Sequence, residues 1–500
     1  MKIKKTINII FIVLCITLAA GIGAFIYNAN NGYDINNYFV SLPLQFNPDD
    51  SSSTYQMKDV KITVHGGFVK GLQKGNGGTE SLVLRALSPL PSITVEGKGP
   101  VSVSLILENV NPDYYAKLIA GNNLSMNKVA ANTLQLNVEI SAGETIEVEP
   151  LQPETADNTG GNKYVILGDN RDGYDTFGEI IQQVNGESPI FVIDNGDLVF
   201  SGKPNQYRLF DQMTSKISTT LCTTLGNHDM RGNGRETYTK LYGPAYYSFD
   251  FTDSHFVFVD SSPGWTEKQA ISDEQYLWLE RDLKKAQGKK IFVITHIPPK
   301  DPRSGVTKNE IPNYVNRVKN GESWIEKRLD NYNYNKKMAH GFQDPEETLK
   351  FENLMSTYHV DTVYLSHIHS YMEYTKDNVR YLISGGAGAE LLFENSYFHY
   401  MIAKIGDIKT TTMVELPSPA NNYVTRYLAT IQLFASAMYK ENRVAVIFIV
   451  AGFALFISLV IIKIYLWRKN SFDTFSGWIR DSGKYSGKRF KQLFGRSKDK

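Results

Sequence analysis

The sequence predicts an α/β domain preceded by a smaller all-β domain. Between residues 57 and 150, short runs of alternating apolar and polar residues are separated by Gly, Pro and Asn, which is typical of a β-sandwich. A polar linker follows at 151–163, and beyond it apolar strands alternate with helical stretches. That alternation is typical of a layered α/β domain with buried strands. A chain of 500 residues is long enough for both domains.

The all-β domain is expected to follow a spacer, residues 28–56, which is rich in Asn, Asp and Ser. The domain itself, residues 57–150, shows no cluster of His, Cys or carboxylates that suggests a reactive site. We therefore interpret it as a spacer or docking module, and its protein partner is unknown. Its expected strands are 60–64, 81–84, 101–107, 134–138 and 145–148.

The α/β domain is expected to span residues 164–408. Helical stretches are expected at 174–183 and 273–286. A long polar insertion lies between His296 and Phe351, and insertions of this kind often act as lids or substrate loops. The expected strands are 164–167, 190–193, 219–224, 255–259, 290–295, 362–365, 379–383 and 398–405.

The N-terminal end carries an apolar segment. Three lysines precede an uncharged run at 7–27. Residues 1–27 therefore fit both a cleaved signal peptide and an uncleaved transmembrane anchor.

The C-terminal end carries a second apolar segment. Residues 409–443 are expected to form a juxtamembrane segment that is partly helical. The run 444–462 is uncharged, and Lys463, Trp467 and Arg468 follow it as interfacial anchors. We therefore expect a transmembrane helix at 444–467.

The charge pattern predicts the orientation. The tail 468–500 holds ten Lys or Arg against three Asp or Glu. Basic residues favour the cytoplasmic side, so both charged ends would point inward and the long middle part would face outward from the cell membrane. Beside a spanning helix, the tail is expected to contact anionic lipid. The whole chain has a net charge of only +1, so the middle part is acidic, and no nucleic-acid scaffold role is expected.

Polar clusters follow the strands of the α/β domain. They place carboxylates, an amide and imidazoles at neighbouring strand ends, which is what a two-metal hydrolytic site requires. The clusters are Gly168-Asp169, Gly196-Asp197, Gly226-Asn227-His228-Asp229, Thr295-His296, Ser366-His367-Ile368-His369 and Ser384-Gly385-Gly386-Ala387-Gly388.

Two of these carboxylates, Asp169 and Asp197, would repel each other at adjacent strand ends unless a cation lay between them. A carboxylate that bridges two divalent metals resolves the repulsion. Mixed nitrogen and oxygen ligands suit Zn, Mn, Fe or Co better than Ca or Mg. The candidate ligands are Asp169, Asp197, Asn227, His296, His367 and His369.

His228 neighbours a candidate ligand without being needed as one. Its imidazole could bind a phosphoryl oxygen or protonate a leaving alkoxide. Asp229 is expected to orient it, as carboxylates often orient histidines.

The ordered motifs resemble the calcineurin-like metallophosphoesterase superfamily over about residues 164–405. The stretches 242–250, 255–260 and 274–279 resemble its purple-acid-phosphatase-like branch, in which a β-sandwich commonly precedes the catalytic domain. The resemblance implies a four-layer α/β/β/α sandwich with a dinuclear metal centre. It also implies attack of a metal-bound hydroxide on phosphorus.

The resemblance assigns the ligands. One metal would be bound by Asn227, His296 and His367, and the other by Asp169 and His369. Asp197 would bridge the two metals. Two divalent transition metals (Mn, Zn or Fe) are therefore expected.

The sequence departs from the family pattern at Arg171, where most members carry a histidine. Phe200 stands where purple acid phosphatases carry a tyrosine, so no purple colour is expected. One metal is thus short of a ligand and would be held weakly, with water or Asn170 completing its ligand set. Arg171 could bind substrate phosphate. The alternative is a salt bridge to Asp172 or Asp175.

The expected function is that of a membrane-anchored, outward-facing phosphoesterase. Its substrate would be a phosphomonoester or phosphodiester, with His228 assisting the leaving group. The alternative is a non-catalytic or regulatory cell-surface binding protein that retains a degenerate form of the fold.

Overall fold

The computed structural model separates into two compact units, Tyr33–Leu433 and the two chain ends, Met1–Gly32 with Phe434–Lys500. Each unit is described by itself. The structure describes residues 12–21, 23–24, 27, 39–74, 80–115, 123–153, 162–262, 269–304, 340–391, 396–405, 407–417, 423–441, 443–444, 446–447, 449–462, 464–465 and 468.

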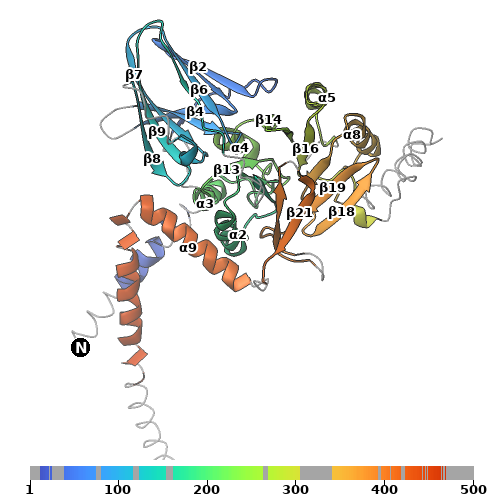
Figure 1. Cartoon of the computed structure of the whole chain (residues 1–500). Helices are drawn as coiled ribbons and strands as arrows, with labels where there is room; N and C mark the ends of the chain where they lie inside the picture. Colours follow the sequence, from blue (N-terminus) through green and yellow to red (C-terminus); the bar gives the residue numbers. More distant parts are fainter. Residues whose placement is uncertain are drawn as a thin grey trace, which may run out of the picture. The chain divides into compact units, whose positions relative to one another are not determined.

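The first part of the large unit consists of two β-sheets in which most neighbouring strands are antiparallel (Figure 1). One sheet has the order β1-β4-β5-β7-β9-β8, with bounds Val40–Ser41, Gly67–Lys74, Glu80–Ala86, Val101–Glu108, Thr133–Ile140 and Leu124–Ala130. The other has the order β10-β6-β3-β2, with bounds Thr145–Val148, Ser92–Gly97, Val60–His65 and Ser52–Gln56. Alternate residues of β3 are buried, and they share one apolar core with residues of both sheets.

The expected spacer 28–56 is in part a piece of these sheets. β1 pairs with β4, and β2 pairs with β3 over its whole length. The prediction of a separate spacer is therefore wrong for these strands. The polar sequence of β2 does not show a strand pattern. The strand is ordered by backbone pairing with β3, in which Thr54 and Tyr55 lie opposite Thr63 and Ile62.

The second part is an α/β domain with two further sheets. One has the order β13-β12-β11-β20-β21, with bounds Thr220–Thr223, Phe191–Asp194, Lys163–Leu167, His399–Lys404 and Asp407–Glu415. The other has the order β14-β15-β16-β17-β19-β18, with bounds Tyr247–Phe251, Ser254–Val259, Lys290–Thr295, Thr362–Leu365, Val379–Ser384 and Tyr371–Lys376. The fold is mixed α/β, as the sequence predicts.

The apolar core between these two sheets is aromatic. Tyr164 and Phe191 of one sheet and Phe256 and Phe292 of the other belong to a single buried cluster. The rings of Tyr164 and Phe191 stack at 5.2 Å, and Phe256 meets Phe191 edge-on at 5.1 Å. The sheets are therefore held face to face.

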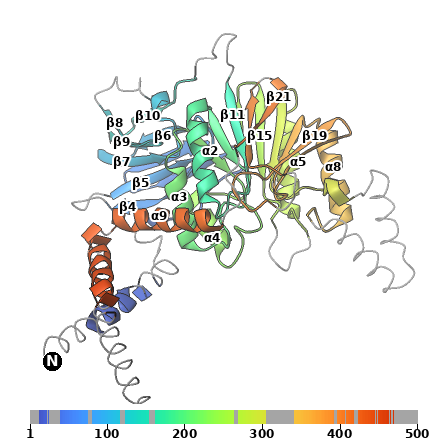
Figure 2. The same cartoon turned by 90° about the horizontal axis from the view of Figure 1, so that it is seen from below.

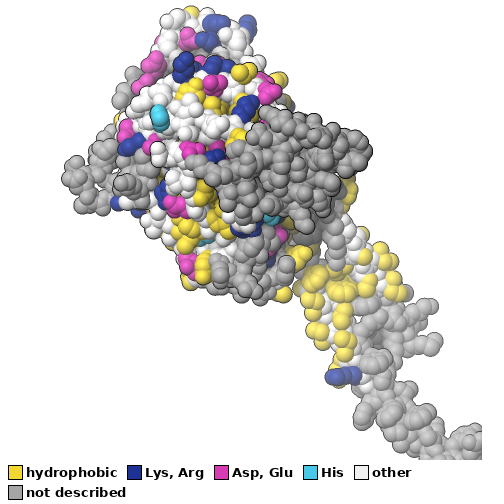
Figure 3. All heavy atoms as spheres, turned by 90° about the vertical axis from the view of Figure 1, so that its right-hand side faces the viewer, with side chains coloured by type: hydrophobic (Ala, Val, Ile, Leu, Met, Phe, Trp, Pro, Cys, Tyr) yellow, Lys and Arg dark blue, Asp and Glu magenta, His cyan; other side chains and the backbone are white. Residues whose placement is uncertain are grey.

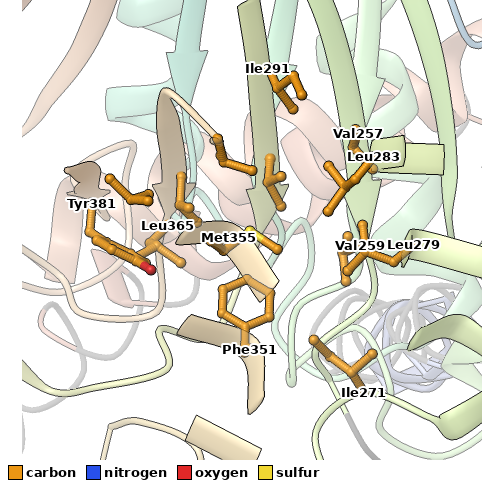
Figure 4. Close-up of a cluster of buried hydrophobic side chains, with 14 of the residues drawn as sticks. Val257, Val259, Ile271, Leu279, Leu283, Ile291, Phe351, Met355, Leu365 and Tyr381 are labelled. Carbon is orange, nitrogen blue, oxygen red and sulfur yellow. The ribbon is translucent and has the colours of Figure 1, made fainter. Parts of the chain in front are cut away.

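Helices cover the outer face of the β14-β15-β16-β17-β19-β18 sheet. α5 (Asp273–Lys285) begins after Ser272, whose side chain accepts a hydrogen bond from the amide of Gln275. α8 (Pro345–Thr357) begins after Asp344, with a proline at its first position. Figure 4 shows Leu279 and Leu283 of α5 and Phe351 and Met355 of α8 pointing toward apolar strand residues.

Three more helices belong to the α/β domain: α2 (Tyr174–Glu187), α3 (Pro204–Thr214) and α4 (Gly234–Tyr242). α2 and α3 lie side by side in Figures 1 and 2, with the rings of Phe177 and Phe210 stacked at 5.9 Å. Val165 and Val192, which alternate with the residues of the aromatic core, are fully buried. The outer face of the five-stranded sheet is therefore also covered.

The strands run parallel where the polar clusters follow them. β11, β12 and β13 are parallel neighbours, and so are β15, β16, β17 and β19. Their carboxyl ends therefore meet at one edge of each sheet.

The β-sandwich and the α/β domain share packing. Phe68 and Leu87 of the sandwich belong to the aromatic core cluster of the α/β domain. Asn109 forms two hydrogen bonds of 2.9 Å with the backbone of Leu221, one to its N–H and one to its carbonyl. Gly243, at φ +99°, ends α4 against Phe68, where an added Cβ would lie 2.7 Å from the ring.

The chain ends form the second unit. The expected membrane segments 1–27 and 444–467 lie partly outside the described residues, as do linker residues 154–161, insertion residues 305–339 and tail residues 469–500. Among the residues the structure describes, no helix combines the length and apolar character needed to cross a membrane. Helical residues include 12–21 and 449–462, and α9 is Tyr423–Glu441. Figure 3 shows hydrophobic side chains over much of the described surface of this unit.

Candidate metal centre

The polar clusters form loops with an unusual backbone. Asp169, Asp197 and His367 have φ values of 59°, 56° and 68°, in the left-handed region. Non-glycine residues rarely adopt this conformation, and where they do the strain is concentrated at functional sites. Gly226 packs so closely that an added Cβ would lie 2.1 Å from the amide nitrogen of Asp197. The loops are therefore held tightly together.

Asp169, Asp197 and His369 lie close together and form the first group of candidate ligands. All three are buried, and one potential ligand atom from each lies within 4.8 Å of the others. Oδ2 of Asp169 accepts hydrogen bonds from the Ser366 hydroxyl and the His367 amide, both at 2.7 Å. Its Oδ1 has no hydrogen-bond partner among the described residues and lies 3.7 Å from Nε2 of His369.

The pKa of Asp169 reflects its neighbours. Burial opposes its ionisation, but the charges of His369, His296 and Arg171 and the hydrogen bond from Ser366 outweigh burial and lower the pKa. Asp169 is therefore a carboxylate, the form that binds a metal.

A second group lies around Asp197 and contains Asn227 and His296. Nδ1 of His296 donates to the carbonyl of Asn195 at 2.7 Å, which leaves the lone pair on Nε2. That Nε2 lies 3.4 Å from Oδ1 of Asp197 and 3.3 Å from Oδ1 of Asn227.

The His367 ring lies beside this group, 5.3 Å from the ring of His296 between centroids. Burial, with the charge of His296, holds the pKa of His367 well below its usual range, so the ring is neutral. Two imidazoles, a carboxylate and an amide oxygen are a donor set that suits a divalent transition metal. These residues therefore fit one metal.

Arg171 lies against the first group. Its Nη2 is 2.5 Å from Nε2 of His369, and its Nη1 is 2.8 Å from Nε2 of His228. Its Nε is 3.7 Å from Oδ2 of Asp197. Asp172 and Asp175 form no described ion pair with it, so the alternative of a salt bridge to them is wrong. Asp172 instead lies 4.0 Å from Arg426.

The first group does not fit a metal while Arg171 is in this position. Nδ1 of His369 donates to the carbonyl of Glu390 at 2.6 Å, so the Nε2 lone pair is the one that a metal would need. Zinc binds histidine at about 2.0–2.1 Å, and the guanidinium already lies on that lone pair. Charge adds to the conflict, since a divalent ion about 4 Å from a guanidinium is repelled by roughly 8 kcal/mol at an effective dielectric constant near 20.

Asn170 does not complete that group through its amide nitrogen. The nitrogen donates to Oδ2 of Asp194, and Asn170 Oδ1 has no hydrogen-bond partner among the described residues. Burial, with the charge of Asp229, raises the pKa of Asp194 well above its usual range.

One ring nitrogen of His228 bonds to a backbone carbonyl. Nδ1 lies 2.6 Å from the carbonyl of Phe200, to which it donates, so Nε2 accepts from Arg171 and from Arg231, the latter at 2.9 Å. Burial, with the charges of Arg171 and Arg231, lowers the pKa of His228 against the opposing effect of Asp197.

Asp229 does not orient the His228 ring, and that prediction is wrong. Its carboxylate accepts from the amides of Gly226, Val199 and Leu198 at 2.8, 2.9 and 3.2 Å. It therefore fastens the loop after β13 to the loop after β12. Burial, with the charge of Asp197, raises the pKa of Asp229 to about 7.

Sequence reasoning missed several residues around the centre. Arg231 and Phe200 flank His228, and the Phe200 ring lies 5.3 Å from the imidazole and is exposed. The ring of His340, from the expected insertion, lies 5.5 Å from that of His367. Glu390 lies 3.9 Å from Arg171. Only Phe200 had a sequence signal, since its position was compared with the tyrosine of purple acid phosphatases.

A cleft of about 320 Å³ lies elsewhere, where the β-sandwich meets the α/β domain. Its charged side chains pair with one another: Lys289 with Asp250 at 2.6 Å, and His255 with Asp282 at 2.9 Å. None of its lining residues belongs to the candidate metal centre.

Residues 163–371 match the model of the family described as calcineurin-like phosphoesterase. This segment is a calcineurin-like phosphoesterase domain. The resemblance seen in the ordered motifs is thereby confirmed. A domain of this family indicates metal-dependent hydrolysis of phosphoesters.

Similar proteins include two bacterial relatives. The glycerophosphodiester phosphodiesterase GpdQ of Enterobacter lignolyticus is 30% identical over 131 residues, which cover 24% of this chain and 47% of that protein. The probable glycerophosphodiester phosphodiesterase GpdQ of Arcobacter nitrofigilis is 29% identical over 116 residues, which cover 22% and 42%. The chain thus spans less than half the length of either relative.

Among solved structures, the purple acid phosphatase PPD1 from yellow lupin (Lupinus luteus) seeds is similar. It is 13% identical, with a TM-score of 0.40 over 71% of this chain and 76% of that one.

Proposed function

We propose that this protein is a metal-dependent phosphoesterase whose centre is formed by the loops after β11, β12, β13, β16 and β17. One observation carries the proposal. Within a segment that matches the phosphoesterase family, Nε2 of His296 lies within 3.4 Å of the Oδ1 atoms of both Asp197 and Asn227, with His367 beside them.

In the proposed mechanism, a metal held by these four residues supplies Lewis-acid activation of water and of the phosphoryl group. The protein's own groups orient the substrate. Arg171 presents a fixed cation beside Asp197, where its planar guanidinium matches the geometry of phosphoryl oxygens. His228, anchored at Nδ1, turns Nε2 toward Arg171, so Nε2 would have to take up a proton before it could donate one to the leaving oxygen.

The substrate class is a small phosphodiester or phosphomonoester. The names of the two bacterial relatives favour a phosphodiester. Phe200, exposed beside His228, offers an apolar surface for the group esterified to the phosphate.

A second candidate function is non-catalytic ligand binding by a degenerate centre. The position of Arg171 at the first group of ligands favours it. The two functions differ in turnover, which a binding protein lacks.

The test is hydrolysis of para-nitrophenyl phosphate and bis-para-nitrophenyl phosphate by the full chain in detergent, with Mn²⁺ or Zn²⁺. We expect metal-dependent turnover with at least one of the two esters. Asp197→Asn should reduce kcat/KM by a factor of about 100 or more, because it removes a charged metal ligand. The matched control Asp113→Asn, at an exposed aspartate of the β-sandwich, should change nothing. Folded protein without turnover under any of these conditions would favour the binding protein.

We also propose attachment to a membrane through the apolar chain ends, with the phosphoesterase domain on the outer side. The apolar runs and the basic tail of the sequence support this proposal. So do the exposed side chains of Val450, Phe453 and Leu455, because a helix that leaves such residues in water is unfavourable.

A further inference from the structure

We propose that Arg171 takes the place of one of the two metals, so that the centre binds a single divalent ion beside a built-in guanidinium. The inference rests on the proposed function, and it names how this site handles the charge of a phosphoryl group. The single ion would be held by Asp197, Asn227, His296 and His367. The other group of ligands, Asp169 and His369, serves the arginine.

The lone pair of His369 is already occupied. Because Nδ1 donates to the Glu390 carbonyl, Nε2 is the only acceptor of that ring, and Arg171 Nη2 lies 2.5 Å from it. A metal ion and a guanidinium nitrogen cannot share one lone pair.

The site also buries carboxylate charge. Asp169 is fully buried, and a buried charge must be compensated. Nε of Arg171 lies 3.7 Å from Oδ2 of Asp197, and a ligand atom of Asp197 lies within 4.8 Å of one of Asp169. The guanidinium thus supplies positive charge that a metal would otherwise provide at this position.

The arginine is also fixed in position. Its side chain is 5% exposed, its amide donates to the carbonyl of Asp197 at 2.9 Å, and its φ is +34°. His228 and His369 accept from its two terminal nitrogens. Because both its backbone and its guanidinium are held, the Arg171 side chain is not expected to move away when a metal ion binds.

These contacts leave part of the guanidinium available. Of its five N–H groups, one on each terminal nitrogen meets a histidine, and Nε has no hydrogen-bond partner among the described residues. Because Nε is buried beside Asp197, the second N–H group on each terminal nitrogen is the one left to donate to phosphoryl oxygens. A covalently attached cation also stays in place at low metal concentration, unlike a weakly bound second ion.

The test measures metal content and is independent of turnover. The full chain in detergent is loaded with Mn²⁺, desalted, and examined by elemental analysis and by electron paramagnetic resonance. We expect about one Mn²⁺ per chain and the spectrum of an isolated ion. Arg171→His, which places an imidazole where most family members have one, should bind about two and give the spectrum of a spin-coupled pair.

The matched control is Arg231→His, at an arginine that also contacts His228, at 2.9 Å. It should still bind one ion. Two ions in the wild-type chain, no ion in it, or one ion in the Arg171→His variant would each overturn the proposal. Should Arg171→His not fold, as judged by circular dichroism, Arg171→Ala serves in its place. Loss of turnover alone bears on the proposed function and leaves the metal count as a separate result.

Discussion

His255 is a buried imidazole held between two carboxylates. Its Nδ1 lies 2.8 Å from Asp250 on β14, and its Nε2 lies 2.9 Å from Asp282 on α5. Burial alone would lower the pKa of His255, but these hydrogen bonds and charges raise it to about 9. One protonated side chain thus fastens a strand pair to the helix that covers it.

This contact makes stability depend on pH. The folded pKa of His255 lies above the ordinary value of 6.5, so its contribution is complete below about pH 6.5 and is lost as the pH rises through about 9. His255→Gln should lower the free energy of unfolding by roughly 2–3 kcal/mol at pH 6 and by much less above pH 9. Urea denaturation at both pH values measures this. The exposed His65→Gln is the control, and a pH-independent difference between wild type and His255→Gln would contradict the assignment.

At the same scale, the sequence predicts the ligand types and their order but not every contact. Asp169, Asp197 and the histidines follow apolar runs, so their convergence at strand ends could be expected. The contacts of Arg171 depend on a left-handed backbone and on a carbonyl of Glu390, more than 200 residues away. Asp229 binds amides of a different loop, which no local pattern reveals.

At the scale of elements, Asn109 joins the end of β7 to β13. The residue has φ +65°, a conformation that asparagine tolerates better than most residues. Its side chain bonds both backbone groups of Leu221 and also the carbonyl of Ala86. An edge strand of the phosphoesterase domain is thereby capped by the sandwich.

Removing this side chain should weaken the whole unit. Asn109→Ala leaves a buried N–H and a buried carbonyl of Leu221 without their partner, so we expect a loss of roughly 2–3 kcal/mol in the free energy of unfolding. Thermal denaturation followed by circular dichroism checks this. Asn111→Ala is the control, because its side chain bonds the exposed amide of Asp113 and the side chain of Tyr114, both within the sandwich. Equal effects of the two substitutions would show that the joint contributes nothing.

The elements that could be predicted are the continuous apolar runs. β11, β15, β16 and β17 lie within about a residue of their expected bounds. β18 and β21 were missed because their sequences, YMEYTK and DIKTTTMVE, are mostly polar and form strands by pairing at sheet edges.

At the scale of the whole molecule, the chain ends and the large unit have opposite surfaces. Among the described residues, the large unit buries most of its apolar side chains in shared clusters, whereas the end segment exposes Phe453 at 47% and Ile457 at 47%. A surface of this kind is unfavourable in water. The proposed membrane attachment supplies one.

Attachment can be measured by fractionation of cells that express the full chain. We expect the wild type to remain in the membrane pellet after an alkaline carbonate wash. Phe453→Arg combined with Ile457→Arg should move the protein to the supernatant, since a charge near the centre of a spanning helix costs about 3 kcal/mol each. Val129→Arg, at an exposed position of β8, is the control. Wild-type protein in the supernatant would contradict the proposal.

The left-handed backbone at Asp169, Asp197 and His367 has a consequence for how this protein can change. Glycine adopts that conformation without strain, whereas a side chain at each of these positions costs about 1 kcal/mol or more of backbone strain. The two carboxylates also accept hydrogen bonds, Asp169 from Ser366 and His367 and Asp197 from His228, so exchange for glycine would lose those contacts. Strain at three positions of one centre points to a requirement other than folding, and stabilised versions of this chain will have to gain their stability elsewhere.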